Sequence, residues 1–231
     1  MKVRPVAPSR DLIHSDQGLA LIVVLLSSTL LLALGGGLIM LATTESRIAA
    51  TFRDGHAVLY ASEAAIARAL ADVAASGGLD DLLDGTRLST FVDGPPTGVR
   101  TFAGGTFDIG TATNEERCGA PVCTVDAMTA VTAERPWGAN NPRWQPFAFG
   151  GMSALVAGSP PGLYVVVWVG DDPLETDGDP LRDAPDPLDP GHEVLLLRAA
   201  GYGPHGVRRR VEAAVVRSGR EVRVRSWRPL S

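Results

Sequence analysis

Two cysteines are the residues of this sequence whose type and spacing point most directly to a chemical bond. Cys118 and Cys123 are its only cysteines, and Gly119 and Pro121 between them favour a turn that brings the two thiols together. In an exported domain such a pair is typical of a disulfide that closes a small loop, whereas two buried free thiols are the alternative. Zinc would need two further ligands at fitting spacing, which the four histidines do not supply. We therefore predict a disulfide between Cys118 and Cys123.

A second group of residues that could do chemistry lies in a proline-rich acidic segment, residues 170–193. Nine carboxylates share this segment with one arginine, Arg182. Hard cations such as calcium bind clustered oxygen ligands, and Asp177 and Asp179 are the candidates for such a site. The spacing does not match an EF-hand loop, however, and the five prolines favour an extended chain. A solvated surface loop is therefore favoured over a calcium site, and no other cofactor is expected.

The sequence lacks three common motifs of catalytic and nucleotide-binding sites. It has no H-E-x-x-H zinc motif, no G-x-S-x-G nucleophile motif and no phosphate-binding loop. Residues 201–206, G-Y-G-P-H-G, match the glycine spacing of a dinucleotide-binding loop, but residues 207–211 favour a strand where that loop requires a helix. We therefore expect a structural subunit and not an enzyme.

The C-terminal residues are basic, in contrast to the acidic segment. Eight arginines occur from residue 208 to residue 228, against Glu212 and Glu221. Alternation at residues 222–225 places Arg223 and Arg225 on one face of a strand, which would be solvated or would pair with the acidic segment of the same or a neighbouring subunit. Because the chain has a net charge of -5 and lacks aromatic residues interleaved with these arginines, we do not expect it to bind nucleic acid.

The element that must position these residues begins with an apolar stretch. No charged residue occurs at positions 17–44, and a bilayer core needs only about 20 helical residues. Because a secretory signal peptide has an apolar core of about 7–15 residues, this longer stretch should remain in the protein as a transmembrane helix. Lys2, Arg4 and Arg10 precede it, which favours a cytoplasmic N-terminus and an exported remainder.

The helical pattern continues beyond this stretch and is followed by short apolar runs. Six apolar residues recur on one helix face: Ile48, Phe52, Leu59, Ile66, Leu70 and Val73. No proline interrupts residues 19–73, and residues 76–78, S-G-G, favour a helix end. Strands are predicted at residues 106–111, 163–169, 193–200, 207–216 and 222–227, with a hairpin around residues 201–206. We expect an α+β fold in which these strands pack on the apolar helix face.

The N-terminal sequence resembles that of a known family. A polar leader ends at Gly18, an apolar run begins at Leu19, and the helix carries the segments T-T-E-S-R-I-A, F-R-D and A-S-E-A-A within residues 43–65. Over roughly the first 75 residues, these features are similar to PilX-type minor pilins of the type IV pilin-like superfamily. The resemblance implies a leader peptide at residues 1–18, a transmembrane helix at 19–44, an amphipathic helix at 45–76 and a loop-rich β head at 77–231.

The resemblance also implies a processing site. Prepilin peptidase would cut after Gly18, and Leu19 would become an N-methylated terminus; in a plain single-pass anchor, Gly18 would be only a turn before the helix. Major pilins have a glutamate four residues after the new terminus, where this chain has Val23. Since a buried ammonium group needs an anionic partner, a subunit without that glutamate can offer its terminus to a neighbour but cannot receive one. The resemblance therefore implies a position at or near a filament tip.

A PilX-type role implies a set of partners and a location. The subunit would prime or cap type IV pilus assembly from the inner membrane, with its head in the periplasm, and would later lie in the filament or at its tip. Its partners would be other minor and major pilins, prepilin peptidase, the inner-membrane assembly platform and a tip adhesin. Two alternatives remain open: a tip pseudopilin of a type II secretion system, and a membrane-tethered periplasmic binding domain outside any filament.

Overall fold

The computed structural model describes residues 13–230, with side chains described from Gly18 onward. Residues 1–12 of the predicted leader lie outside the described residues, whereas residues 13–18 form the start of a helix. The chain divides into two compact units, Met1–Phe52 and Arg53–Ser231, which we call the helical unit and the head unit. The boundary falls inside one helix, α1 (Ile13–Ala74), so each unit contains part of it.

In the helical unit, α1 carries apolar side chains that are exposed to solvent. This helix is long and apolar enough to cross a membrane. Ile48 and Phe52 are 64% and 69% exposed, so the prediction that they share the buried face of the helix is wrong. The reason is that residues of α1 become buried only from Gly55 onward, where the sheet begins to cover the helix. The predicted C-terminal end is close to the observed one at Ala74.

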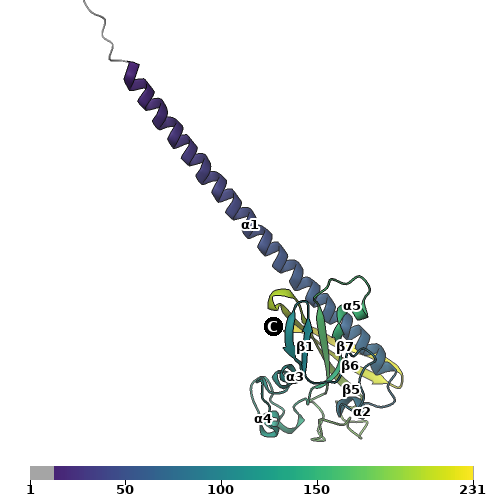
Figure 1. Ribbon diagram of the computed structural model, residues 1–231. Helices are drawn as coiled ribbons and strands as arrows, with labels where there is room; N and C mark the ends of the chain where they lie inside the picture. The colour runs from purple at the N-terminus through teal and green to yellow at the C-terminus, as the bar shows by residue number, and fades with distance from the viewer. Residues whose placement is uncertain (1–12, 231) are drawn as a thin grey trace, which may run out of the picture. The chain divides into compact units, whose positions relative to one another are not determined.

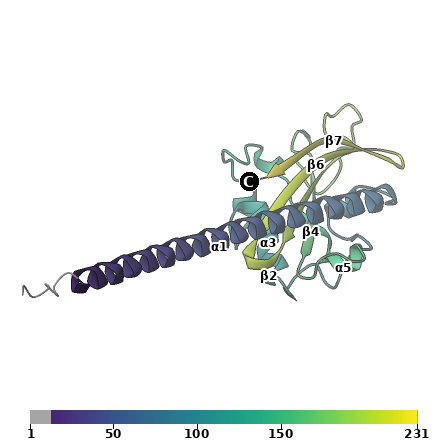
Figure 2. The same cartoon turned by 90° about the horizontal axis from the view of Figure 1, so that it is seen from above.

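The head unit is built on a five-stranded antiparallel sheet in the order β3-β4-β5-β6-β7 (Figure 1). The strands are β3 (Gln145–Gly151), β4 (Tyr164–Asp171), β5 (Val194–Tyr202), β6 (Arg208–Ser218) and β7 (Glu221–Leu230). Each strand pairs with its neighbour in sequence, and β7 forms one edge of the sheet (Figure 2). The predicted hairpin between β5 and β6 is confirmed, with the 3-10 turn η2 (Pro204–Gly206) at its tip.

One face of the sheet packs on the last turns of α1 (Figure 2). The helix contributes buried residues at three- and four-residue steps: Val58, Ala61, Ala65, Ile66, Ala69 and Val73. The sheet contributes every second residue of its central strands: Val165, Val167, Val169, Leu195, Leu197, Ala199, Val211, Ala213 and Val215. The helical and strand periodicities therefore meet in one core, and the predicted α+β fold is confirmed.

The opposite face of the sheet carries a second, smaller core. It consists of Ile109, Ala112, Trp144, Phe149, Tyr164, Val166, Trp168 and Ala200. The helix α3 (Ile109–Cys118) covers part of this face, and its Thr113 hydroxyl accepts a hydrogen bond of 2.9 Å from the indole N–H of the fully buried Trp168. Both faces of the central strands are thus covered.

Several short elements complete the head unit. They are α2 (Asp80–Leu83), β1 (Val99–Phe102), β2 (Gly105–Asp108), α4 (Val125–Thr129), η1 (Gly138–Asn140) and α5 (Met152–Leu155), and β1 pairs with β2. The predicted strand at 106–111 is correct only for its first residues. Asp108 ends β2 and caps α3, because its carboxylate accepts a 2.7 Å hydrogen bond from the Thr111 N–H.

Candidate functional site: the apolar segment and a charged cavity

The predicted processing residues begin the described apolar segment of α1. Gly18 lies within the helix with open space around the position of a Cβ, and Leu19 and Val23 are 68% and 54% exposed. The run of exposed apolar residues that begins at Leu19 is long enough to cross the hydrocarbon core of a bilayer. Gly35, Gly36 and Gly37 interrupt the larger side chains without interrupting the helix.

The disulfide predicted between Cys118 and Cys123 is present. Cys118 is the last residue of α3, and Gly119 ends the helix in the left-handed conformation, at φ 73°, with its N–H donating to the Glu115 carbonyl at 2.8 Å. This turn brings the two Cα atoms to 5.7 Å from one another. The disulfide therefore anchors the C-terminal end of α3.

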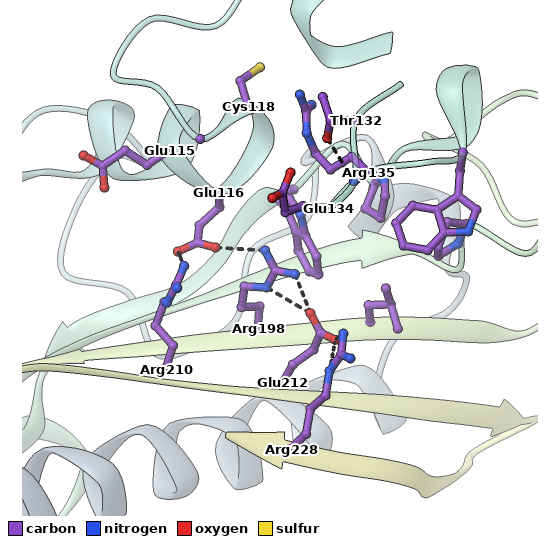
Figure 3. Close-up of a pocket in the computed structure, with 16 residues that line it drawn as sticks. Glu115, Glu116, Cys118, Thr132, Glu134, Arg135, Arg198, Arg210, Glu212 and Arg228 are labelled. Atoms are coloured by element: carbon purple, nitrogen blue, oxygen red, sulfur yellow. Dashed lines mark hydrogen bonds and ion pairs between the residues drawn. The ribbon is translucent and has the colours of Figure 1, made fainter. Parts of the chain in front are cut away.

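Beside this disulfide lies a cavity of about 360 Å³ between α3 and the sheet (Figure 3). Its charged lining is balanced between four glutamates and four arginines: Glu115, Glu116, Glu134, Glu212, Arg135, Arg198, Arg210 and Arg228. Trp137 and Trp144 supply much of its apolar surface. The size lies at the lower end of the range of small-molecule sites.

Three of these charges form a ladder across neighbouring strands (Figure 3). Arg198 on β5, Glu212 on β6 and Arg228 on β7 are direct cross-strand partners. Glu212, with 6% of its side chain exposed, accepts from Arg198 Nε at 3.0 Å and from Arg228 Nε at 2.9 Å. The ladder ties β7 to the centre of the sheet by charge-assisted hydrogen bonds as well as by the backbone.

Glu116 of α3 is the second centre of the charge network. Only 1% of its side chain is exposed, and its oxygens lie 2.9 Å from Arg198 Nη1, 2.7 Å from Arg208 Nη2 and 3.5 Å from Arg210 Nη1. The Arg198 guanidinium also lies 4.0 Å from the centre of the Trp144 ring, which is a cation–π contact. Glu116 thereby docks α3 onto β5 and β6.

Burial perturbs other ionisable groups around this face. Burial, followed by the charge of Arg143, lowers the pKa of Arg117, which donates 2.8 Å and 2.7 Å hydrogen bonds to the Trp144 carbonyl and the Gln145 amide oxygen. Burial raises the pKa of Tyr202 to about 12. Arg117 thus connects the end of α3 to the start of β3.

The C-terminal arginines meet the acidic segment only in part among the described residues. Burial raises the pKa of Asp172, and the charge of Arg225 opposes that shift, whereas Arg223 pairs with Glu221 at 2.8 Å. Arg208, Arg210 and Arg228 lie in ion pairs with Glu115, Glu116 and Glu212, which belong to α3 and β6 and not to the acidic segment. Sequence reasoning missed Glu116, because its role depends on where α3 docks. Its only sequence signal was an acidic residue near a predicted strand.

The acidic segment is more structured than the predicted solvated loop. Asp177 and Asp179 are exposed as expected, and the Asp177 carboxylate accepts a 2.9 Å hydrogen bond from the Asp179 N–H. However, Asp171, Asp172 and Glu175 are buried, with 2%, 7% and 2% of each residue exposed. Across residues 18–230, no group of three or more His, Cys, Asp or Glu side chains is arranged to hold a metal ion. The calcium-site prediction at Asp177 and Asp179 therefore gains no support from their geometry.

The glycines of the G-Y-G-P-H-G stretch serve packing. β6 follows the turn, so no helix N-terminus faces the stretch, and a Cβ at Gly201 would meet α1.

Comparison with known proteins gives no further guide to the function of these regions. No protein-family model matches the chain, and no curated protein or solved structure is significantly similar to it.

Proposed function

We propose that this chain is a minor subunit of a type IV pilus-like filament, processed after Gly18 and acting near the filament tip. The observation that carries the proposal is α1, a single helix without a break from Ile13 to Ala74. Its first part presents exposed apolar side chains, and its last turns supply the core of the head unit. One element can then serve as the membrane anchor, as the helix that enters a filament and as the support of the head.

The residue at position 23 supports a place near the tip. Val23 is an exposed apolar side chain, where a glutamate would be needed to neutralise the ammonium group of a neighbouring subunit. The subunit can offer its own amine at Leu19 to the next subunit but has no carboxylate with which to receive one. This one-sided interaction suits a subunit that starts or caps assembly, in contact with other minor and major pilins.

The test is the mass of the N-terminus. The full chain is isolated from membranes of cells with and without an active prepilin peptidase, together with Gly18→Arg and the control Gly77→Arg, which makes the same change at an open position of the head. We expect a new terminus at Leu19 in the wild type and in the control, and an intact leader in Gly18→Arg and in cells lacking the peptidase. An unprocessed wild-type chain in cells with a working peptidase would refute the proposal.

Two further functions are distinguished by related measurements. A tip pseudopilin of a type II secretion system would also be processed, but would co-purify with secretion pseudopilins and not with pilins. A membrane-tethered binding domain would keep its leader, and the cavity between Glu116 and Glu212 is the observation that favours it. Retention of the leader, together with binding of a small ligand that is lost on substitution of Arg210, would establish that function.

A further inference from the structure

The acidic segment folds around the side chain of Glu175. A turn brings Glu175 back beside the end of β4, since its N–H donates to the Asp172 carbonyl at 3.0 Å. Thr176 donates to Asp189 Oδ2 from its N–H at 3.1 Å and from its hydroxyl at 2.7 Å, which closes the segment on itself. Gly191 covers the side chain so closely that a Cβ there would overlap Glu175 Cγ and lie 3.1 Å from Cδ. The Glu175 carboxylate is therefore enclosed and not free to reach solvent.

Four buried side-chain oxygens in this region have no hydrogen-bond partner among the described residues. They are both carboxylate oxygens of Glu175, Oδ1 of Asp171 and Oδ1 of Asn140. The Asn140 amide nitrogen donates to the Glu175 carbonyl, so the amide oxygen is held in the same neighbourhood. The Ala184 N–H faces the Glu175 carboxylate and the Asp172 N–H faces that of Asp171, but neither reaches hydrogen-bond geometry with the oxygens named above. Buried polar atoms without partners are rare in native proteins and call for a missing ligand.

The carboxylates around this point repel one another. Asp171 and Glu175 are each 2% exposed, and the charge of Glu175 acts on Asp171. A buried carboxylate pair must be neutralised by protons or by a cation.

The other acids nearby are already engaged or exposed. Asp183 accepts a 2.7 Å hydrogen bond from the Glu193 N–H and lies 3.4 Å from His192 Nδ1. Asp172 accepts a 3.1 Å hydrogen bond from the Leu174 N–H. Asp171 and Glu175 are thus the buried acids with oxygens left to bind a ligand, and the outer acids supply a negative field.

We propose that Asp171, Glu175 and Asn140 form a calcium-binding site that closes the acidic segment onto the end of β4. The donors are carboxylate and amide oxygens, which hard cations prefer over the nitrogen and sulfur ligands of zinc. Two buried carboxylates match the charge of one divalent ion. Calcium is favoured over magnesium because it accepts irregular sets of oxygen ligands and gives up its water more readily. Water and backbone carbonyls supply the remaining ligands. This site is independent of the proposed filament function.

Calcium binding to the purified full chain in detergent tests the site. The wild type, the double variant Asp171→Asn/Glu175→Gln and the control Asp177→Asn/Asp179→Asn are freed of metal with a chelator and titrated with CaCl2 or MgCl2 by calorimetry. At a hundredfold excess over Kd we expect calcium to raise the Tm of the wild type and the control by about 5 °C or more. We expect no such shift in the double variant, and a weaker response to magnesium.

An infrared measurement separates a cation site from a protonated acid pair and does not depend on how the variants fold. Wild type without metal should show a protonated carboxyl band at neutral pH that disappears when calcium saturates the site. Absence of a calcium response in the wild type, an equal response in Asp171→Asn/Glu175→Gln, or a carboxyl band that persists in saturating calcium would each overturn the proposal.

Discussion

Gly201 on β5 lies so close to Val58 on α1 that a Cβ atom on Gly201 would stand 2.6 Å from the Val58 carbonyl oxygen. The same atom would stand 2.7 Å from Ser62 Oγ, which donates 3.0 Å and 3.3 Å hydrogen bonds to the carbonyl oxygens of Val58 and Arg209. Helix and sheet are therefore connected here by a close backbone approach and a shared hydroxyl. Only glycine leaves room for that arrangement.

Gly201→Ala should separate α1 from the sheet and destabilise the head unit. We expect a loss of about 2 kcal/mol, typical of overpacking in a well-packed core, measured by denaturant unfolding of the full chain followed by the fluorescence of the buried Trp144 and Trp168. Gly78→Ala is the matched control, because no atom lies within 4 Å of the position of its Cβ. Equal unfolding midpoints for the two variants would show that the contact is unimportant.

Glu116→Gln should destabilise the head unit much more than the same change at the adjacent Glu115. Glu116 is buried among three arginines, and neutralising it leaves their charges uncompensated, at about 3 kcal/mol. Glu115 has 41% of its side chain exposed and pairs with Arg208, so Glu115→Gln should change the free energy of unfolding by less than about 1 kcal/mol. The comparison uses denaturant unfolding, and similar losses in both variants would contradict the burial argument.

Stability should fall as the pH rises in the presence of a chelator. The folded-state pKa of Glu175 is raised from 4.5 to about 7 and that of Asp171 from 3.8 to about 9. At a pH between its unfolded-state and folded-state pKa, each carboxyl group keeps a proton in the folded chain that it has lost in the unfolded chain. Each group therefore lowers the free energy of unfolding by up to about 1.4 kcal/mol per pH unit. The free energy of unfolding should therefore decrease from about pH 5 to about pH 8.

The control for this pH dependence is Asp171→Asn/Glu175→Gln, which should flatten the profile. The exposed Asp186→Asn variant should retain the decrease. A flat profile over the same interval in the wild type would contradict the prediction, because it would mean that both buried acids are ionised in the folded chain.

Removal of the disulfide should lower the stability of the head unit modestly. For so short a loop, the gain from restricting the unfolded chain is about 2 kcal/mol. Cys118→Ser/Cys123→Ser should lose this amount, measured by denaturant unfolding with and without a reducing agent. The reducing agent should shift the midpoint of the wild type and leave that of the double variant unchanged; a wild type insensitive to reduction would contradict the prediction.

Periodicity in the sequence predicted the elements that dominate the core. The helix was predictable because no proline interrupts residues 19–73, and β4, β5, β6 and β7 were predictable from runs rich in valine and leucine. β3 was not predicted, because its sequence Q-P-F-A-F-G-G contains proline and glycine, which are uncommon inside strands. Residues 109–111 are predicted as a strand but begin α3. The start of this helix is hard to predict, because the capping role of Asp108 depends on the helix that follows it.

The charged residues were less predictable than the fold. The sequence shows that arginines and acids are abundant, but Glu116 and Glu175 become important only through the docking of α3 and the folding of residues 171–193. Their partners are far away in sequence; Arg208 lies 92 residues from Glu116. The prediction of a fully solvated acidic segment failed because it rested on composition, which does not reveal which acids are enclosed by the chain.

The free edge of the sheet determines how two copies of the head unit can contact one another. β7 has no further strand beside it in the described residues. The unpaired backbone groups of an exposed edge strand can form hydrogen bonds with a strand of another chain. Pro229 lacks an N–H to offer, Arg223 pairs with Glu221 at 2.8 Å, and Arg228 pairs with Glu212. A proline on an edge strand cannot donate to an added strand, so Pro229 limits the pairing of this edge with another chain.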